Sequence, residues 1–141
     1  MLITSAQVES VVAEVSAGAS DPNHMATVVG GLMQRQGAIG HYVQGHAREL
    51  SLEGTVMLLL HTAVLLRCVE VATGRDVPRL DFRALDRAAQ APEVEHIFEA
   101  QPALASYVDT NIVGDDPTLG GARRPVARKI VAILLNAILV P

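Results

Sequence analysis

The chain has 141 residues, a formal net charge of −4 and a single cysteine. A chain of this length buries roughly two thirds of the surface that it exposes when unfolded, so we expect one domain, residues 1–141, with its own core. The acidic balance argues against a nucleic-acid partner, because such proteins usually carry a basic surplus, and one cysteine excludes an intramolecular disulfide.

The residue types favour packed helices. Hydrophobic residues make up 50% of the chain but only 3% is aromatic, so aliphatic side chains fill the core. The apolar runs at residues 54–66 and 130–140 are shorter than the roughly 17 to 25 residues of a membrane-spanning helix. They predict buried helices and no membrane association. The opening MLITSAQVES has no basic residue before an apolar stretch, which predicts a cytoplasmic protein rather than a secreted one.

Start and stop signals divide the first half into four helices. Thr4 or Ser5 caps the first, with Gln7 placed for a capping box, and Asp21 before Pro22 caps the second. A third helix starts near Gly37, and Ser51 caps a long fourth helix. The predicted spans are about 5–16, 22–35, 37–50 and 52–72.

The same plan restarts in the second half. Asp81 is placed to cap one helix, and Pro92, Pro102 and Pro125 each open another. We find no sustained alternation of apolar and polar residues and no hairpin signal, so no strand is predicted. The fold class expected from these patterns is all-α.

One motif occurs in both halves. Gln101 follows Gln36 by 65 residues, and Tyr107 follows Tyr42 by the same interval. Self-similarity at a fixed interval indicates an internal repeat. We therefore predict a helical bundle built from two tandem copies of a roughly four-helix unit, about 4–74 and about 79–141, related by a pseudo-twofold axis.

The repeated glutamine and tyrosine have two interpretations. Pro102 forces Gln101 out of the helical region, so each glutamine is expected at a break between helices, where its amide can pair with backbone groups. Each tyrosine then faces inward and needs a partner for its hydroxyl. Either Gln36, Tyr42, Gln101 and Tyr107 hold the fold together or they line one ligand pocket. The sequence leaves both open.

Metal binding has one weak candidate. Glu93 and His96 form an E-x-x-H pair, as in di-metal helical bundles, where a second such pair completes the site. The matching positions of the first half are Val28 and Gly31, so no cofactor is expected. His61 lies in the middle of the apolar fourth helix and is interpreted as a buried core histidine with possible pH sensitivity.

The remaining signals point to interaction rather than catalysis. No nucleophile elbow, phosphate loop or dinucleotide motif is present in the sequence. Four basic residues lie in the loop before the last predicted helix and in its first turns. They are interpreted either as part of a solvated loop or as a patch for a small anion or an acidic partner: Arg123, Arg124, Arg128 and Lys129.

The rest of that helix is apolar nearly all round, which predicts a homodimer interface that includes Leu135 and Ile138. The expected function is thus a non-enzymatic interaction or self-association module, with a possible further protein partner. The alternative is a helical bundle that binds a small ligand or a metal, possibly with catalysis, through Tyr42, Tyr107, Glu93 and His96.

Overall fold

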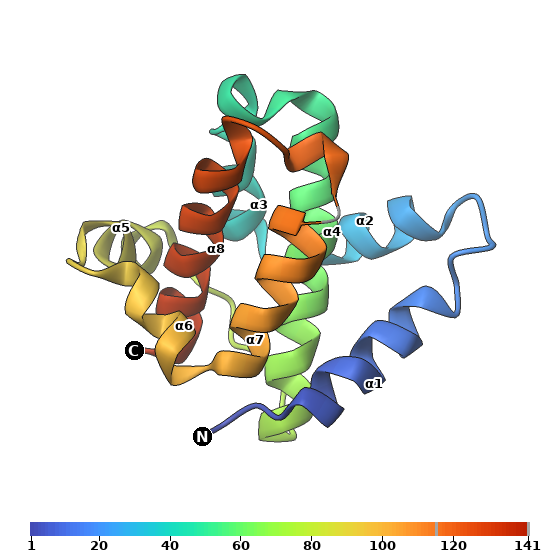
Figure 1. Ribbon diagram of the computed structural model, residues 1–141, viewed down its shortest axis with the longest axis horizontal. Coiled ribbons are helices and arrows are strands. Elements are labelled where there is room, and N and C mark those ends of the chain that lie inside the picture. Colours follow the sequence, from blue (N-terminus) through green and yellow to red (C-terminus); the bar gives the residue numbers. More distant parts are fainter. Residues whose placement is uncertain (115, 141) are drawn as a thin grey trace.

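The computed structural model describes residues 1–114 and 116–140. As predicted, these residues form an all-helical protein, and no strand is found among them (Figure 1). The α-helices are α1 (Ser5–Ser16), α2 (His24–Arg35), α3 (Gly37–Gln44), α4 (Ala47–Thr73), α5 (Phe82–Gln90), α6 (Ile97–Ala100), α7 (Pro102–Tyr107) and α8 (Arg123–Leu139). Short 3-10 turns cover Val94–His96 and Pro117–Leu119, and a π-helical segment covers Val108–Gly114.

The predicted caps at Thr4 and Asp81 are present. Thr4 accepts a hydrogen bond from the backbone of Gln7, whose side chain accepts one from the backbone of Thr4 in return. Asp81 accepts a hydrogen bond from the backbone N–H of Ala84 and so caps α5. Both contacts satisfy N–H groups that a helix start leaves without partners, which is why these two helices begin where the sequence places them.

The second helix begins later than expected. The Asp21 carboxylate accepts a hydrogen bond from the N–H of Asn23, two residues on, so it stabilises a turn instead of capping a helix. The helix starts only at His24, whose ring nitrogen Nε2 lies 2.6 Å from the carbonyl oxygen of Val15. This contact joins α2 to the last turns of α1.

The start of α4 contains a sharp interruption at Ser51. The third predicted helix ends at Gln44 instead of near Leu50, and residues from Ala47 form one helical turn before Ser51 takes φ 67° and ψ 169°. The Ser51 hydroxyl accepts a hydrogen bond from the Gly54 N–H at 3.2 Å, so Ser51 does cap the long apolar part of α4 as predicted.

In the middle of the second half, the observed helices differ from the predicted ones. Glu93 has a left-handed backbone with φ 56°, so Pro92 does not open a helix and Glu93 is not helical. A 3-10 turn and the four-residue α6 replace the predicted helix. The helix opened by Pro102 stays α-helical only to Tyr107, and α8 starts at Arg123, before Pro125.

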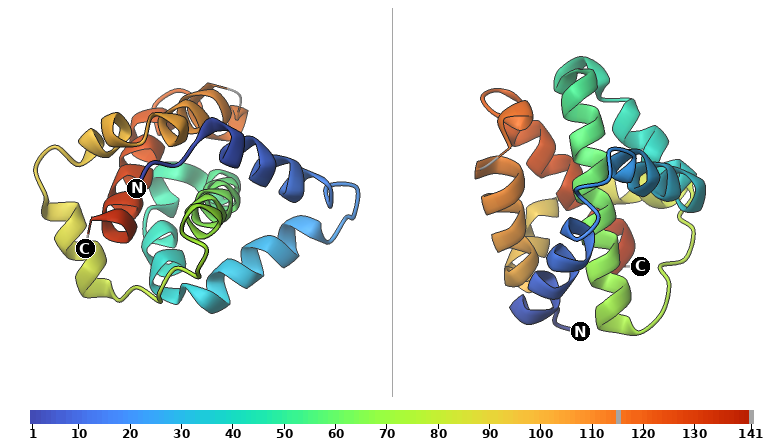
Figure 2. Two further views of the ribbon diagram at one scale, coloured as in Figure 1. Left: turned by 90° about the horizontal axis from the view of Figure 1, so that it is seen from below. Right: turned by 90° about the vertical axis from the view of Figure 1, so that its right-hand side faces the viewer.

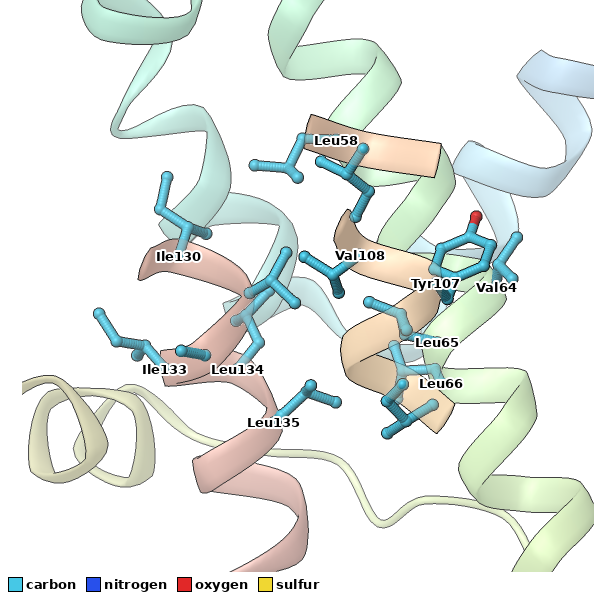
Figure 3. Close-up of a cluster of buried hydrophobic side chains, with 14 of the residues drawn as sticks. Leu58, Val64, Leu65, Leu66, Tyr107, Val108, Ile130, Ile133, Leu134 and Leu135 are labelled. Carbon is cyan, nitrogen blue, oxygen red and sulfur yellow. The ribbon is translucent and has the colours of Figure 1, made fainter. Parts of the chain in front are cut away.

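The core is formed around α4 and α8, which pack against each other. Figure 3 shows side chains of α4, α7 and α8 gathered between these helices, among them Leu65, Tyr107 and Leu135. Residues Ile130 to Leu135 of α8 are all buried inside the single chain. The last helix is therefore enclosed by its own domain over most of its length, because α4, α5, α6 and the segments 94–96, 108–114 and 117–119 surround it.

Helices α1 and α5, the first helices of the two halves, each pack against helices of both halves. Helix α1 lies on α4 and also on α7, while α5 lies on α8 and also on α3. Figure 2 shows α1 and α2 extending away from the rest of the molecule toward the loop at residues 17–23, which joins them. Each first helix thus contacts both halves of the chain.

Helix α4 is long and apolar enough, by length and composition alone, to cross a membrane, with a mean hydropathy of 1.7 over its most apolar window. In the structure 61% of that window is buried against the rest of the protein. Buried core helices meet the same criterion, and α4 packs against α1, α2, α3 and α8.

Candidate functional site

Both repeated glutamines lie at breaks between helices, as predicted. Gln36 has φ −133° and ψ 63°, and Gln101 has φ −129° and ψ 71°. Each ends one helix and directly precedes the next, and both side chains are buried, with 4% and 6% of the residue exposed. The two residues therefore share one backbone conformation and one kind of place in the fold.

The side chain of each glutamine holds an extended segment of backbone. The amide nitrogen of Gln101 donates to the carbonyl of Met1 at 2.7 Å, and its oxygen accepts from the N–H of Ile3 at 3.0 Å. Gln36 donates in the same way to the carbonyl of Pro78 at 3.0 Å and accepts from the N–H of Leu80 at 2.9 Å. We name these two arrangements the glutamine clamps. In both clamps the amide nitrogen and the amide oxygen are hydrogen-bonded to backbone groups, which indicates a structural role.

Tyr107 is part of a buried hydrogen-bonded chain. Its hydroxyl lies 2.9 Å from Nδ1 of His61, and Nε2 of His61 lies 3.0 Å from a carboxylate oxygen of Asp116. Because an ionised carboxylate only accepts, Nε2 carries a proton and donates it to Asp116. In the neutral imidazole, Nδ1 then accepts a hydrogen bond from the Tyr107 O–H.

The pKa values of Tyr107 and Asp116, at the two ends of this chain of contacts, are shifted in opposite directions. Burial, with smaller effects of Cys68 and Asp116, raises the pKa of Tyr107, so its hydroxyl stays protonated. Burial also raises the pKa of Asp116, but hydrogen bonds from Thr118 and His61 outweigh it and place that pKa below its usual value. The Asp116 carboxylate is therefore charged near neutral pH. Both of its oxygens accept hydrogen bonds.

These contacts fix the loop before α8 to α4. The second carboxylate oxygen of Asp116 accepts hydrogen bonds from the backbone N–H and the hydroxyl of Thr118 at 3.0 Å and 2.6 Å. The sequence indicated His61 and Tyr107 separately, but it did not predict that His61 contacts Asp116, which is 55 residues away along the chain. An aspartate in a loop carries no sequence signal of such a long-range partner.

Tyr42 has a different environment from Tyr107. It is partly buried, and its ring lies edge-on to that of His46, with 5.2 Å between the ring centroids. Burial, followed by the charges of Asp86 and Glu49, raises the pKa of Tyr42. The hydroxyl is therefore protonated near neutral pH, and within residues 1–114 and 116–140 no hydrogen bond to it is found.

A hollow of about 280 Å³ opens beside Tyr42. It lies between α3, the first turn of α4, α5 and α8, and we name it the Tyr42 pocket. Its lining brings together two residues that the sequence had placed in separate candidate sites, Tyr42 and Lys129. The complete lining is Tyr42, His46, Glu49, Ala89, Val126, Lys129, Ile130 and Ile133.

The weak metal candidate is not completed by other residues. Nδ1 of His96 and a carboxylate oxygen of Glu93 lie 3.4 Å apart, and both side chains are largely exposed. In the described part of the chain, no group of three or more His, Cys, Asp or Glu residues is placed to hold a metal ion. His96 lies on the 3-10 turn Val94–His96 and Glu93 precedes that turn with a left-handed backbone, so the two do not share one face of an α-helix.

The basic residues at the start of α8 fall into two groups. Arg128 binds Asp109 at 3.1 Å and Glu95 at 2.6 Å and stacks on the ring of Phe98. Arg123 donates to the carbonyl of Thr118. These two arginines join parts of the same chain, whereas Arg124 and Lys129 are exposed.

The predicted interface residues and Cys68 are placed differently from one another. Leu135 is 1% exposed, inside the core of the single chain, and its side chain does not reach the surface. Ile138 is partly buried at the end of α8.

Cys68 is fully buried, and burial raises its pKa to about 11, so it remains a protonated thiol near neutral pH.

Comparison with protein-family models, with curated protein sequences and with solved structures gives no match.

Proposed function

We propose that the protein is a non-enzymatic interaction module that self-associates as a homodimer. The observation that carries this proposal is an apolar groove between α5 and the last turn of α8, with a volume of about 420 Å³. Alanine, leucine and valine side chains dominate its lining, which consists of Leu80, Ala84, Arg87, Ala88, Ala91, Asn136, Ala137 and Val140.

An exposed apolar side chain in the groove supports this location. Val140, which lines the groove, is 58% exposed. Apolar surface on two adjacent elements favours association, because covering it removes that surface from water. A twofold arrangement brings the same groove of both copies together. Leu135 contributes to the core and not to this contact, and Ile138, which packs partly buried against the core, is not among the residues that line the groove.

The buried polar groups support a non-enzymatic role. Tyr107, His61 and Asp116 form a hydroxyl, imidazole and carboxylate series, but they are only 7%, 9% and 8% exposed. Every polar end of this series faces another side chain or backbone group of the protein. Such a satisfied network stabilises a fold.

The experiment is light scattering on groove variants. Val140→Glu and Ala84→Glu place a carboxylate in the groove and should convert a dimer to a monomer without loss of helix content. Leu52→Glu is the matched control, since Leu52 is 80% exposed on another part of the surface. A monomer mass for the unmodified protein at micromolar concentration would contradict the proposal.

We also propose that the two halves are copies of one four-helix unit related by a pseudo-twofold axis. The matching glutamine clamps and the crossed packing of α1 on α7 and of α5 on α3 support this. The interval is not constant, however: Asp81 follows Thr4 by 77 residues, while Gln101 follows Gln36 by 65. On this proposal the first half carries a longer α1 and α2 than the corresponding part of the second.

The charge balance supports a protein partner over a nucleic acid. The formal net charge is −4, and two of the four candidate basic residues at the start of α8 already bind groups of this chain. A cytoplasmic location without membrane association remains our prediction from the sequence. It is checked by fractionating cells that express the tagged protein.

A further inference from the structure

The two tyrosines of the repeated motif differ in what their hydroxyls do. The Tyr107 hydroxyl is bonded to His61 in the interior. The Tyr42 hydroxyl has no such partner in the described part of the chain, and its side chain lines an open hollow. A protonated phenol without a partner beside a hollow is free to hydrogen-bond a ligand.

The floor of the Tyr42 pocket is apolar. Ile130 and Ile133 are 2% and 4% exposed, so they are fixed in the core, and half-buried Ala89 and Val126 flank them. A volume of about 280 Å³ lies near the lower end of the usual range for ligand sites, about 300–1,000 Å³. The pocket therefore suits a small molecule with an apolar body.

Charges of opposite sign line the pocket. On α8, Lys129 contributes an ammonium group, and no carboxylate of the described residues forms an ion pair with it. On α4, Glu49 contributes a carboxylate that lies 2.9 Å from Nδ1 of His46. Asp86 adds a second negative charge that acts on Tyr42. The lining is thus positive at Lys129 and negative around Tyr42 and Glu49.

We propose that the Tyr42 pocket binds a small zwitterion with an apolar body, of which an apolar α-amino acid is the simplest example. Its carboxylate pairs with Lys129, its ammonium group lies toward Glu49 and the Tyr42 hydroxyl oxygen, and its side chain covers Ile130 and Ile133. A simple anion is repelled by Glu49 and Asp86, and a simple amine is repelled by Lys129. Only a ligand with both charges matches both ends.

This site is separate from the groove proposed for self-association. On α8 the groove uses residues from Asn136 on, whereas the pocket uses residues up to Ile133, and the two have no lining residue in common. A variant can therefore lose ligand binding and still form the dimer, or lose the dimer and still bind the ligand.

The test uses the full chain and three matched probes: leucine, isovalerate, which lacks the ammonium group, and isoamylamine, which lacks the carboxylate. Amide chemical shifts are followed by NMR during titration at millimolar ligand. We expect leucine to shift resonances around Tyr42, Lys129 and Ala89, and each of the other two probes to bind about tenfold more weakly, because one charged contact is lost.

Variants assign the contacts. Lys129→Gln and Glu49→Gln should each weaken leucine binding by about tenfold, and Tyr42→Phe by a smaller factor, because a neutral group loses less than a charged one. Arg124→Gln is the matched control, a neutralised exposed cation on the same helix outside the pocket lining, and should bind as the unmodified protein does. The Val140→Glu variant should also bind leucine.

Two results would overturn the proposal. One is the absence of localised shifts with leucine at millimolar concentration. The other is binding that is equal for leucine and isovalerate or that survives Lys129→Gln, because the two-charge recognition would then be wrong. A spectrum of each variant without ligand shows whether it is folded, so loss of binding is not confused with loss of structure.

Discussion

Gln36 and Gln101 hold, with the same pair of hydrogen bonds, the segment that leads into the first helix of the other half. Gln101 of the second half holds Met1 and Ile3, and Gln36 of the first half holds Pro78 and Leu80. In both cases the residue that follows the clamped segment caps a helix, Thr4 in one and Asp81 in the other. The clamps therefore fix where α1 and α5 begin.

The clamps should be important for stability. Gln101→Leu removes both hydrogen bonds and leaves two backbone groups without partners, so we expect the free energy of unfolding to fall by about 2 kcal/mol or more. Gln101→Glu keeps the acceptor but loses the donor to Met1, and should destabilise by a similar amount. Urea denaturation followed by circular dichroism measures both.

Gln44→Leu serves as the control for the clamps, since Gln44 is an exposed glutamine at the end of α3. Its effect should stay within about 0.5 kcal/mol. Equal effects of Gln44→Leu and Gln101→Leu would show that the clamp bonds contribute little.

The two tyrosines should respond differently to removal of the hydroxyl. Tyr107→Phe leaves Nδ1 of His61 without its buried partner and should destabilise the fold by about 1 kcal/mol. Tyr42→Phe removes a hydroxyl with no protein partner among the described residues and should change stability by less than about 0.5 kcal/mol. Thermal or urea unfolding of both variants tests this difference. Equal loss of stability in the two variants would show that both tyrosines are structural.

Asp116 should make stability depend on pH. Its pKa in the folded protein is lower than its ordinary value of about 3.9. Its contacts thus contribute fully above that ordinary pKa, and the contribution is lost as pH falls through the folded pKa. Asp116→Asn should be less stable than the unmodified protein at pH about 7, and the difference should shrink at acidic pH. An unfolding series in urea across this range measures the difference, and a constant gap would contradict it.

Ser51 should be one of the few positions where glycine stabilises. Its φ of 67° and ψ of 169° lie in a region that is essentially restricted to glycine and costs other residues about 1–3 kcal/mol. Ser51→Gly removes this strain while the loss of the hydroxyl cap costs only a few tenths of a kcal/mol, so we expect a net gain of about 1 kcal/mol. Ser51→Ala keeps the strain and loses the cap, and should destabilise. Melting temperatures of the two variants should move in opposite directions.

The sequence by itself determined the features that depend on neighbouring residues. Capping side chains at Thr4, Ser51 and Asp81 and the helix breaks at Gln36 and Gln101 were predicted because each acts over a few residues of chain. The all-helical fold follows from the same short-range signals together with aliphatic composition. Local errors, at Asp21 and Glu93, arose where a side chain or a proline stabilises a turn instead of a helix.

Only the tertiary structure decided which distant groups meet. No spacing in the sequence connects Gln101 with Met1, His61 with Asp116, or Tyr42 with Lys129. The apolar character of α8 predicted that it needs cover, but not that α4, α5 and α6 supply it inside one chain. Periodicity shows that a helix face must be buried, whereas the partner that buries it is set by how all the helices pack together.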